Sequence, residues 1–427
     1  MDGKSPEKRA IRLGAVLGTA ILLAACGGGS AGSPPPAAAT NSPAANSSQG
    51  KAPYVIYAEL ALTGAVGVLG QEEKLALDAL QAQVNRQGGV DGHPIEFKIL
   101  DNESSPSVAV QLASPLVQRH IPLLLNGSVT STAAAVDALV EKAGPLTYAL
   151  TPGVSPHGAA DYVFSTSLSV ADLLKAAFNF FLSQGWTRVA VITPEDATGQ
   201  DVWSNIQTVT KLPAYRQIQI VTHQTFADSA VSVATQVTEM AAAHPQVIIS
   251  WATGSPQEVV FKDLKQSSLA NLPVLTSNGN QTYALMQRWA QILPAKLYFG
   301  AGPWAIPGAV QGSVKTAVAQ FYDAFKGMTV DGQPVKPDVG ETLAWDPARL
   351  FIHLLRVDGL NASAAQYRDT LEQLHGWAGV NGVYNFSAED HRGLSLQDTY
   401  IVQWDAQQQT WVPVSGPGGS APASPSP

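Results

Sequence analysis

The feature that most constrains this chain is a regular alternation of short apolar segments with helical segments. Residues 54–60 read as a strand, and Leu77, Leu80 and Val84 then recur at helical spacing. Strands separated by helices of about 10–15 residues build parallel sheets with right-handed crossovers. The further strands are expected at 95–100, 121–125, 145–150, 189–192, 217–221, 247–249 and 273–276, and the later helices at 130–143, 199–211, 231–243, 256–267 and 281–291.

The folded part, residues 53–414, is too long for one such sheet and suits two. We therefore expect an α/β protein. In open parallel sheets, ligands bind beyond the carboxyl ends of the strands. The loops that lead from strand to helix are accordingly the places to look for function.

The first 26 residues carry the pattern of an export signal. Basic side chains precede an apolar run over residues 13–25, which is too short for a membrane span of about 20 residues. The run ends in Leu23-Ala24-Ala25-Cys26, which resembles a bacterial lipobox. We expect residues 1–25 to be removed as a lipoprotein signal peptide and Cys26 to be acylated. The alternative is a secreted protein with an incidental free thiol.

Residues 26–52 are expected to form a lipid-anchored flexible linker. Apart from Cys26 and Lys51 they are all Gly, Ser, Pro, Ala, Thr, Asn or Gln, and such a segment buries too little apolar surface to order itself. Residues 415–427 have the same character, and we expect a disordered tail there. These segments predict a body tethered to a bacterial membrane outside the cytoplasm.

Composition excludes several functions. The net charge of −8 makes a nucleic-acid partner unfavourable, because few cations are available to displace phosphate counterions. With one cysteine the chain can form no intramolecular disulfide and no zinc site built from several thiolates. We expect no metal, no cofactor and a monomeric protein.

Several short sequence motifs, none of them specific by itself, follow one another in an order that is informative as a whole. They are LTG at 62–64, LGQE at 69–72, NRQGGVDG at 85–92, DNE at 101–103, AGP at 143–145, TPGVS at 151–155, EDATGQ at 195–200, AWD at 344–346, and strand segments at 382–385 and 402–404. Their shared order resembles the type I periplasmic binding proteins of branched-chain amino acid ABC transporters, the group of the leucine/isoleucine/valine-binding protein.

The resemblance implies two doubly wound parallel-sheet lobes, joined by three crossings, with a central cleft. Lobe 1 would comprise 53–166 plus 303–398, and lobe 2 would comprise 167–302 plus 399–414. The lobes would close on a small solute, and the closed form would dock on an ABC permease in the membrane. A ligand-sensing receptor module of the same fold is the alternative.

The family's site places a helix N-terminus against the ligand carboxylate, where free N–H groups and the positive end of the helix dipole face the anion. Ser128, Thr130 and Ser131 match that position. The alternative is that Thr130 or Ser131 merely caps the helix. The resemblance assigns the second contact loop to Gly153, Val154 and Ser155, for which the alternative is an ordinary Pro-Gly turn.

Departures from the family concern the ligand's other end. Thr198 and Leu69 stand where the family has tyrosines, and Asn278 stands where it has the acid that receives an ammonium group. A buried ammonium needs a paired charge or several acceptors, so Asn278 argues against a standard amino acid. A small carboxylate, amide or aromatic solute is expected instead, with Trp251, Thr253 and Trp304 as further contacts. The alternative for the two tryptophans is core or interdomain packing.

An enzyme is not expected. The segment from Gly153 to Gly158 resembles a nucleophile elbow around Ser155, but it lacks the G-x-S-x-G spacing, and Pro156 has no N–H for an oxyanion hole. The histidines are scattered and include no H-E-x-x-H motif. A secreted hydrolase is kept as a remote alternative.

Overall fold

The structure, a computed structural model, describes residues 51–154 and 161–422. The signal peptide, Cys26 and nearly all of the linker lie outside the described residues, and so does Ser155. None of the helices in the described ranges is both long enough and apolar enough to span a bilayer.

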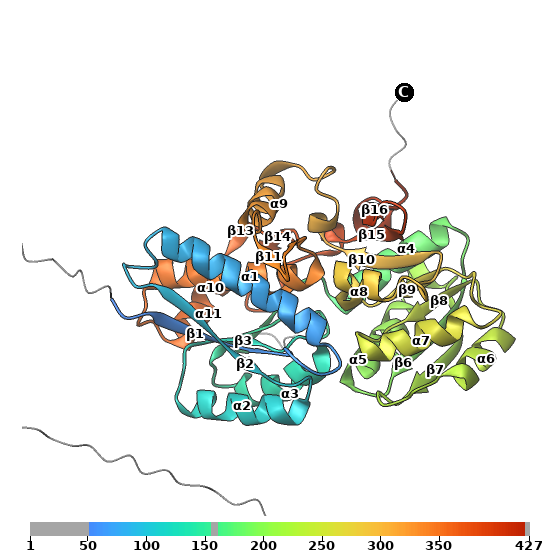
Figure 1. The fold of residues 1–427 in the computed structure, drawn as a ribbon, viewed down its shortest axis with the longest axis horizontal. Coiled ribbons are helices and arrows are strands. Elements are labelled where there is room, and N and C mark those ends of the chain that lie inside the picture. The colour runs from blue at the N-terminus through green and yellow to red at the C-terminus, as the bar shows by residue number, and fades with distance from the viewer. Residues whose placement is uncertain (1–50, 155–160, 423–427) are drawn as a thin grey trace, which may run out of the picture. The chain divides into compact units, whose positions relative to one another are not determined.

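The first sheet is wholly parallel, with strand order β2-β1-β3-β4-β5. Helices from the later part of the chain pack on this sheet beside the helices that connect its strands. Helix α10 packs against α1 and contacts β3, and α11 contacts β4 (Figure 1). The elements are β1 (Tyr54–Leu60), α1 (Gly67–Arg86), β2 (Ile95–Asp101), α2 (Pro106–Gln118), β3 (Leu123–Asn126), α3 (Thr130–Val140), β4 (Leu146–Ala149), β5 (Val163–Ser165), α9 (Gly312–Ala324), α10 (Val339–Asp358) and α11 (Ala364–Glu372).

The second sheet repeats this winding. Its parallel part has the order β7-β6-β8-β9-β10, and β15 and β16 extend it as antiparallel strands beyond β10. The elements are α4 (Val170–Ser183), β6 (Arg188–Pro194), α5 (Ala197–Val209), β7 (Gln219–Phe226), α6 (Ala234–Ala242), β8 (Val247–Ser250), α7 (Ser255–Lys265), β9 (Val274–Thr276), α8 (Tyr283–Arg288), β10 (Leu297–Ala301), β15 (Tyr400–Asp405) and β16 (Thr410–Pro413).

Short elements complete the chain. Two small hairpins pair β11 (Thr329–Val330) with β12 (Gln333–Pro334) and β13 (His375–Ala378) with β14 (Val383–Asn385). Single 3-10 turns lie at η1 (Pro213–Tyr215), η2 (Asn278–Asn280), η3 (Pro303–Ala305), η4 (Leu396–Asp398) and η5 (Pro417–Gly419).

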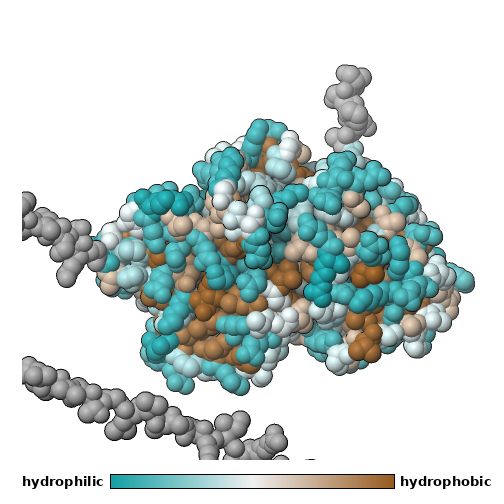
Figure 2. Space-filling view, in the orientation of Figure 1, coloured by the Kyte–Doolittle hydropathy of each residue, from teal (hydrophilic) through white to brown (hydrophobic). Residues whose placement is uncertain are grey.

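The predicted fold class is confirmed: two doubly wound α/β lobes are joined where the chain passes from β5 to α4, from β10 to η3 and from η4 to β15. We call the first sheet with its helices the first lobe and the second sheet with its helices the second lobe. The central strands β3 and β8 are buried at every residue, as expected of parallel strands covered on both faces. On the face seen in Figure 2, hydrophilic residues predominate, and apolar residues gather around β1, β2 and α2.

The segment 415–422, expected to belong to a disordered tail, instead packs on the second lobe. The Ile401 N–H donates to Ser415 Oγ at 2.7 Å, and Asn179 Nδ2 of α4 donates to the Gly418 carbonyl at 2.8 Å. A Cβ at Gly419 would lie 1.9 Å from the Ala176 carbonyl oxygen. Small residues here allow the backbone to lie directly against α4, so their composition reflects close packing and not disorder.

Candidate functional site

Loops at the carboxyl ends of strands in both sheets meet around one pocket. The first lobe contributes side chains from α1 and from the loops after β3 and β4, and the second lobe contributes side chains after β6, β8 and β9. In each sheet this is the point where the strand order reverses, which is where doubly wound sheets bind ligands. The predicted residues that line this pocket are Leu69, Ser128, Thr130, Gly153, Thr198, Trp251, Thr253 and Asn278.

Three other predicted residues lie elsewhere. Ser131 lines an adjoining pocket, and Val154 is buried in the core of the first lobe. Trp304 is also buried, and its ring packs edge-on against Trp411 with centroids 5.9 Å apart. Trp304 therefore contributes to packing at the crossing between β10 and η3.

Sequence reasoning missed several lining residues: Val129, Thr151, Pro152, Val170, Ser277, Gly279 and Leu343. Five of these stand within two residues of predicted positions: Val129 before α3, Thr151 and Pro152 in the TPGVS motif, and Ser277 and Gly279 in the turn around Asn278. The local motif was therefore a usable signal. Val170 and Leu343 are apolar helix residues, and their sequence neighbourhoods do not distinguish them from core positions.

The N-terminus of α3 opens onto the pocket without a side-chain cap. Its N-cap residue is Val129, whose side chain has no acceptor, so the alternative that Thr130 or Ser131 merely caps the helix is wrong. Thr130 Oγ1 instead lies 3.3 Å from Thr151 Oγ1. The first-turn N–H groups of α3 and the positive end of its dipole therefore remain available to an anion.

The loop after β4 lies against this helix start. A Cβ on Gly153 would lie 1.9 Å from Thr130 Oγ1, so only glycine allows the backbone to come so close. This contact brings the carbonyl and N–H groups of the loop to the pocket beside the α3 N-terminus.

Polar groups of the second lobe form the opposite wall. Asn280 fixes the loop after β8, because its Nδ2 donates to the Ala252 carbonyl at 2.7 Å and its Oδ1 accepts from the Gly254 N–H at 2.9 Å. Asn278 is buried, and its Oδ1 has no partner among the described residues. A buried oxygen without a partner is costly, so a donor on a ligand would be favoured there.

No charged side chain occurs among the described residues that line this pocket. The two lobes touch at its edge, where the Ser255 N–H of α7 donates to the Ala65 carbonyl of the first lobe at 3.2 Å. The remaining space has a volume of about 20 Å³, enough for about one water molecule. A larger solute therefore requires the lobes or lining side chains to move.

One arginine holds the loop that carries Gly153. The Arg392 guanidinium is buried and donates to four carbonyls: those of Thr166 and Ser167 at 3.1 and 3.3 Å, and those of Pro152 and Val154 at 3.0 and 2.5 Å. It thereby ties the second contact loop to the first crossing between the lobes.

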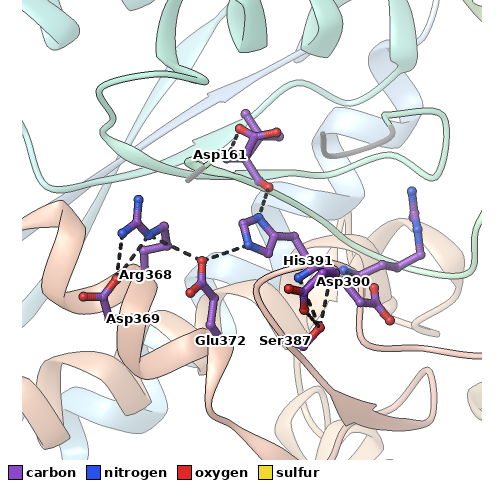
Figure 3. Close-up of polar contacts among 10 residues, drawn as sticks. Asp161, Arg368, Asp369, Glu372, Ser387, Asp390 and His391 are labelled. Atoms are coloured by element: carbon purple, nitrogen blue, oxygen red, sulfur yellow. Dashed lines mark hydrogen bonds and ion pairs between the residues drawn. The ribbon is translucent and has the colours of Figure 1, made fainter. Parts of the chain in front are cut away.

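The preceding residue, His391, anchors this segment (Figure 3). Its Nδ1 lies 3.0 Å from the Val163 carbonyl of β5, and its Nε2 lies 3.0 Å from Glu372 Oε1 of α11. Its ring stacks on Phe164 with centroids 4.0 Å apart. Arg368 also pairs with Glu372, at 3.4 Å, so strand, helix and loop are held as one unit.

Buried acids lie behind the first-lobe wall of the pocket. Burial raises the pKa of Glu59 on β1 to about 7 and that of Asp137 on α3 to about 8. Burial likewise raises the pKa of Glu73 on α1 well above its ordinary value. These carboxyls therefore favour their protonated forms, because a charge would be poorly solvated there.

This cluster predicts that stability falls as pH rises. The folded pKa of Asp137, about 8, lies above its unfolded value of 3.8, so the folded state holds a proton that the unfolded chain releases between these values. The stabilisation is complete below the unfolded pKa and is lost as pH approaches the folded pKa. Between about pH 5 and about pH 8 the melting temperature should fall, and in Asp137→Asn this fall should be smaller by a few degrees. Asp331→Asn, at an exposed turn, should leave it unchanged; equal slopes in both variants would contradict the prediction.

Two lobes of like winding, with one pocket lined from both at the carboxyl ends of their strands, define the class of two-lobed solute-binding proteins of the type I fold. The family model described as periplasmic binding protein matches residues 60–409, and the chain belongs to that family. The family implies a place outside the cytoplasm, and its members and the structural neighbours below are solute-binding or receptor proteins.

Solved structures share the fold. An extracellular ligand-binding receptor from Rhodopseudomonas palustris HaA2 is 19% identical with a TM-score of 0.74, covering 86% of this chain and 100% of that chain. The branched-chain amino acid transporter substrate-binding protein LivJ from Streptococcus pneumoniae, solved with isoleucine, is 17% identical with a TM-score of 0.69, covering 87% and 98%. A solute-binding protein of a Rhodopseudomonas palustris ABC transporter, solved with benzoate, is 19% identical with a TM-score of 0.68, covering 87% and 98%. No curated protein sequence matches the chain.

Proposed function

We propose that this protein is a lipid-anchored solute-binding protein that captures a small carboxylate between its lobes and delivers it to an ABC importer. The observation that carries the proposal is the uncapped α3 N-terminus, which opens onto a pocket shared by both lobes. Such a helix start binds an anion through its free N–H groups. We also propose that Cys26 carries the lipid anchor. Lobe 1 would comprise residues 53–166 plus 303–398, and lobe 2 would comprise residues 167–302 plus 399–414.

The other end of the solute would be neutral. Trp251, which is largely buried and lines the pocket, offers a flat apolar surface. Asn278 supplies an amide for a hydroxyl or amide group of the solute. An ammonium would find no carboxylate among the described lining residues, so an aromatic or hydroxylated monocarboxylate fits better than an amino acid.

Capture would work by population shift. Without solute the open form, with the lobes apart, would predominate. A solute that contacts both walls would stabilise the closed form. Moving the equilibrium from 1:99 to 99:1 takes about 5.5 kcal/mol of differential affinity. Several hydrogen bonds and one aromatic contact supply energies of this order.

The deciding experiment has two steps. Small molecules released from freshly purified protein are identified by mass spectrometry, and a thermal-shift panel then compares benzoate, benzamide, hydroxybenzoates and isoleucine. Benzoate and the hydroxybenzoates should raise the melting temperature, and benzamide and isoleucine should not. A panel in which no carboxylate stabilises the protein would refute the proposal. The mass of the mature N-terminal peptide, measured alongside, tests acylation of Cys26.

The neutral wall makes a separate prediction. Asn278→Asp places a carboxylate beside the position that an amino acid's ammonium group would occupy. Binding of isoleucine should therefore strengthen by about tenfold, and binding of benzoate should weaken by a similar factor. Calorimetric titration of both solutes checks this. Asn280→Asp serves as the contrast, because that side chain holds the loop after β8 through its amide. The same gain of isoleucine binding in both variants would contradict the assignment of Asn278.

A further inference from the structure

The Ser128 hydroxyl stands between the pocket and a buried carboxyl group. Ser128 lines the pocket immediately before α3. Its Oγ accepts a hydrogen bond from the Ala61 N–H at 3.0 Å and lies 2.5 Å from Glu73 Oε2. Glu73 is fully buried on α1, one helical turn beyond the lining residue Leu69, and its Oε1 has no partner among the described residues.

A serine hydroxyl has one hydrogen to donate and two lone pairs to accept with. When Glu73 is ionised, the Ser128 hydrogen is committed to its carboxylate, and the hydroxyl presents only a lone pair to the pocket. When Glu73 is protonated, its own O–H donates to Ser128 Oγ. With Ala61 N–H occupying the second lone pair, the Ser128 hydrogen is then released toward the pocket.

We propose that Glu73 is a positioning residue that couples carboxylate binding to the uptake of one proton. The inference rests on the proposed function, because it assumes that the solute's carboxylate lies beside Ser128. Where Glu73 is still ionised before the solute binds, the proton comes from solvent and ends on the Glu73 carboxyl, whose O–H then bonds Ser128 Oγ. The Ser128 O–H in turn donates to the bound carboxylate, and no covalent bond of the solute changes.

The charged groups around Glu73 favour the protonated form. Glu59 of β1 acts on Glu73 directly, and Asp101 at the end of β2 acts on Glu59. On the neighbouring face of α1, Glu72 is opposed by Asp338 and Glu341 of α10. The charged side chains of α9 face away: Lys315 is exposed and Asp323 pairs with Lys326.

No lysine, arginine or histidine in the described ranges forms a hydrogen bond or ion pair with Glu73. Burial, the largest influence, raises the pKa of Glu73, while the Ser128 hydrogen bond lowers it and Glu59 raises it further. A bound carboxylate adds another negative charge nearby and raises this pKa again. By linkage, affinity should be highest below the pKa of Glu73 and should fall as pH rises through it.

The first measurement is made on the protein without solute. Infrared spectra from about pH 5 to about pH 9 are compared between the unmodified chain and Glu73→Gln. A protonated carboxyl band should be present that Glu73→Gln removes and Ser128→Ala shifts. The inference is overturned if no such band exists, or if Ser128→Ala leaves it in place.

The second measurement uses benzoate, or the panel carboxylate that stabilises the protein most. Titration calorimetry in two buffers of different ionisation enthalpy should show up to one proton taken up per solute, and affinity should fall by at most about tenfold per pH unit. Glu73→Gln donates permanently to Ser128 Oγ, so it should bind well at every pH without proton uptake. Ser128→Ala should bind weakly and also without proton uptake.

A Glu73→Gln variant that keeps the pH dependence of the unmodified protein would overturn the inference, since Glu73 would then be a structural acid only. If no panel carboxylate binds, the proposed function fails, whereas the infrared titration still decides whether Glu73 and Ser128 share a proton. The two failures are therefore distinguishable.

Discussion

Gly254→Ala is expected to weaken solute binding by about 100-fold, because the two lobes can no longer come together. Gly254 precedes α7 with φ +70°, and a Cβ added there would lie 2.3 Å from the Ala65 carbonyl of the first lobe. That carbonyl accepts the Ser255 N–H across the lobe boundary, so the contact is with a backbone atom that has little freedom to move. The added methyl group therefore acts as a wedge at the edge of the pocket.

Gly185→Ala provides the matched control. Gly185 also lies in the second lobe with φ +71°, but a Cβ there would meet nothing within 4 Å, so this variant carries the conformational strain without the wedge. Small-angle scattering should show Gly254→Ala to be more extended than Gly185→Ala in the presence of a panel carboxylate. Equal affinities and equal dimensions for the two variants would refute the closure geometry.

Arg392→Met is expected to destabilise the folded protein by about 3–5 kcal/mol. The methionine fills much of the same space but leaves four carbonyls without their donor, two of them in the loop that carries Gly153. Chemical denaturation measures the loss of stability. Arg392→Lys should recover part of it, because an ammonium keeps the charge but provides fewer, differently directed donors.

The control for this variant is Arg188→Met. Arg188 also donates to two carbonyls, those of Ala243 and His244, but it is only half-buried and lies far from the loop after β4 in the chain. Solvent can replace its hydrogen bonds, so we expect a loss of about 1 kcal/mol or less. If Arg392→Met lowers the free energy of unfolding no more than Arg188→Met does, the four buried hydrogen bonds of Arg392 contribute little to stability.

Much of the fold was predictable because its signals are local. The strand at 54–60 has the predicted bounds, and the helix predicted at 256–267 is observed at Ser255–Lys265, since apolar runs and helical periodicity are read over a few residues. The small strand β5 escaped prediction because three buried residues carry no periodicity. The ordered stretch 415–422 escaped because small residues signal disorder and close packing alike.

The site was predictable only where a motif stands in a loop. Thr130, Trp251 and Asn278 follow strand ends, and the order of strands brings these loops together. Glu73 and Arg392 could not be found in this way. Each acts through contacts made by distant parts of the chain, Glu73 with Ser128 and Arg392 with the carbonyls of Pro152 and Val154.

The long reach of Arg392 has a consequence for how this protein matures. Its bonds to the loop after β4 span 240 and 238 positions of the chain. A polypeptide is synthesised from its N-terminus, so the early segments of the site must wait for almost the whole chain before Arg392 can hold them. The loop after β4 should therefore reach its final position only late in folding, after the segment around residue 392 has been added.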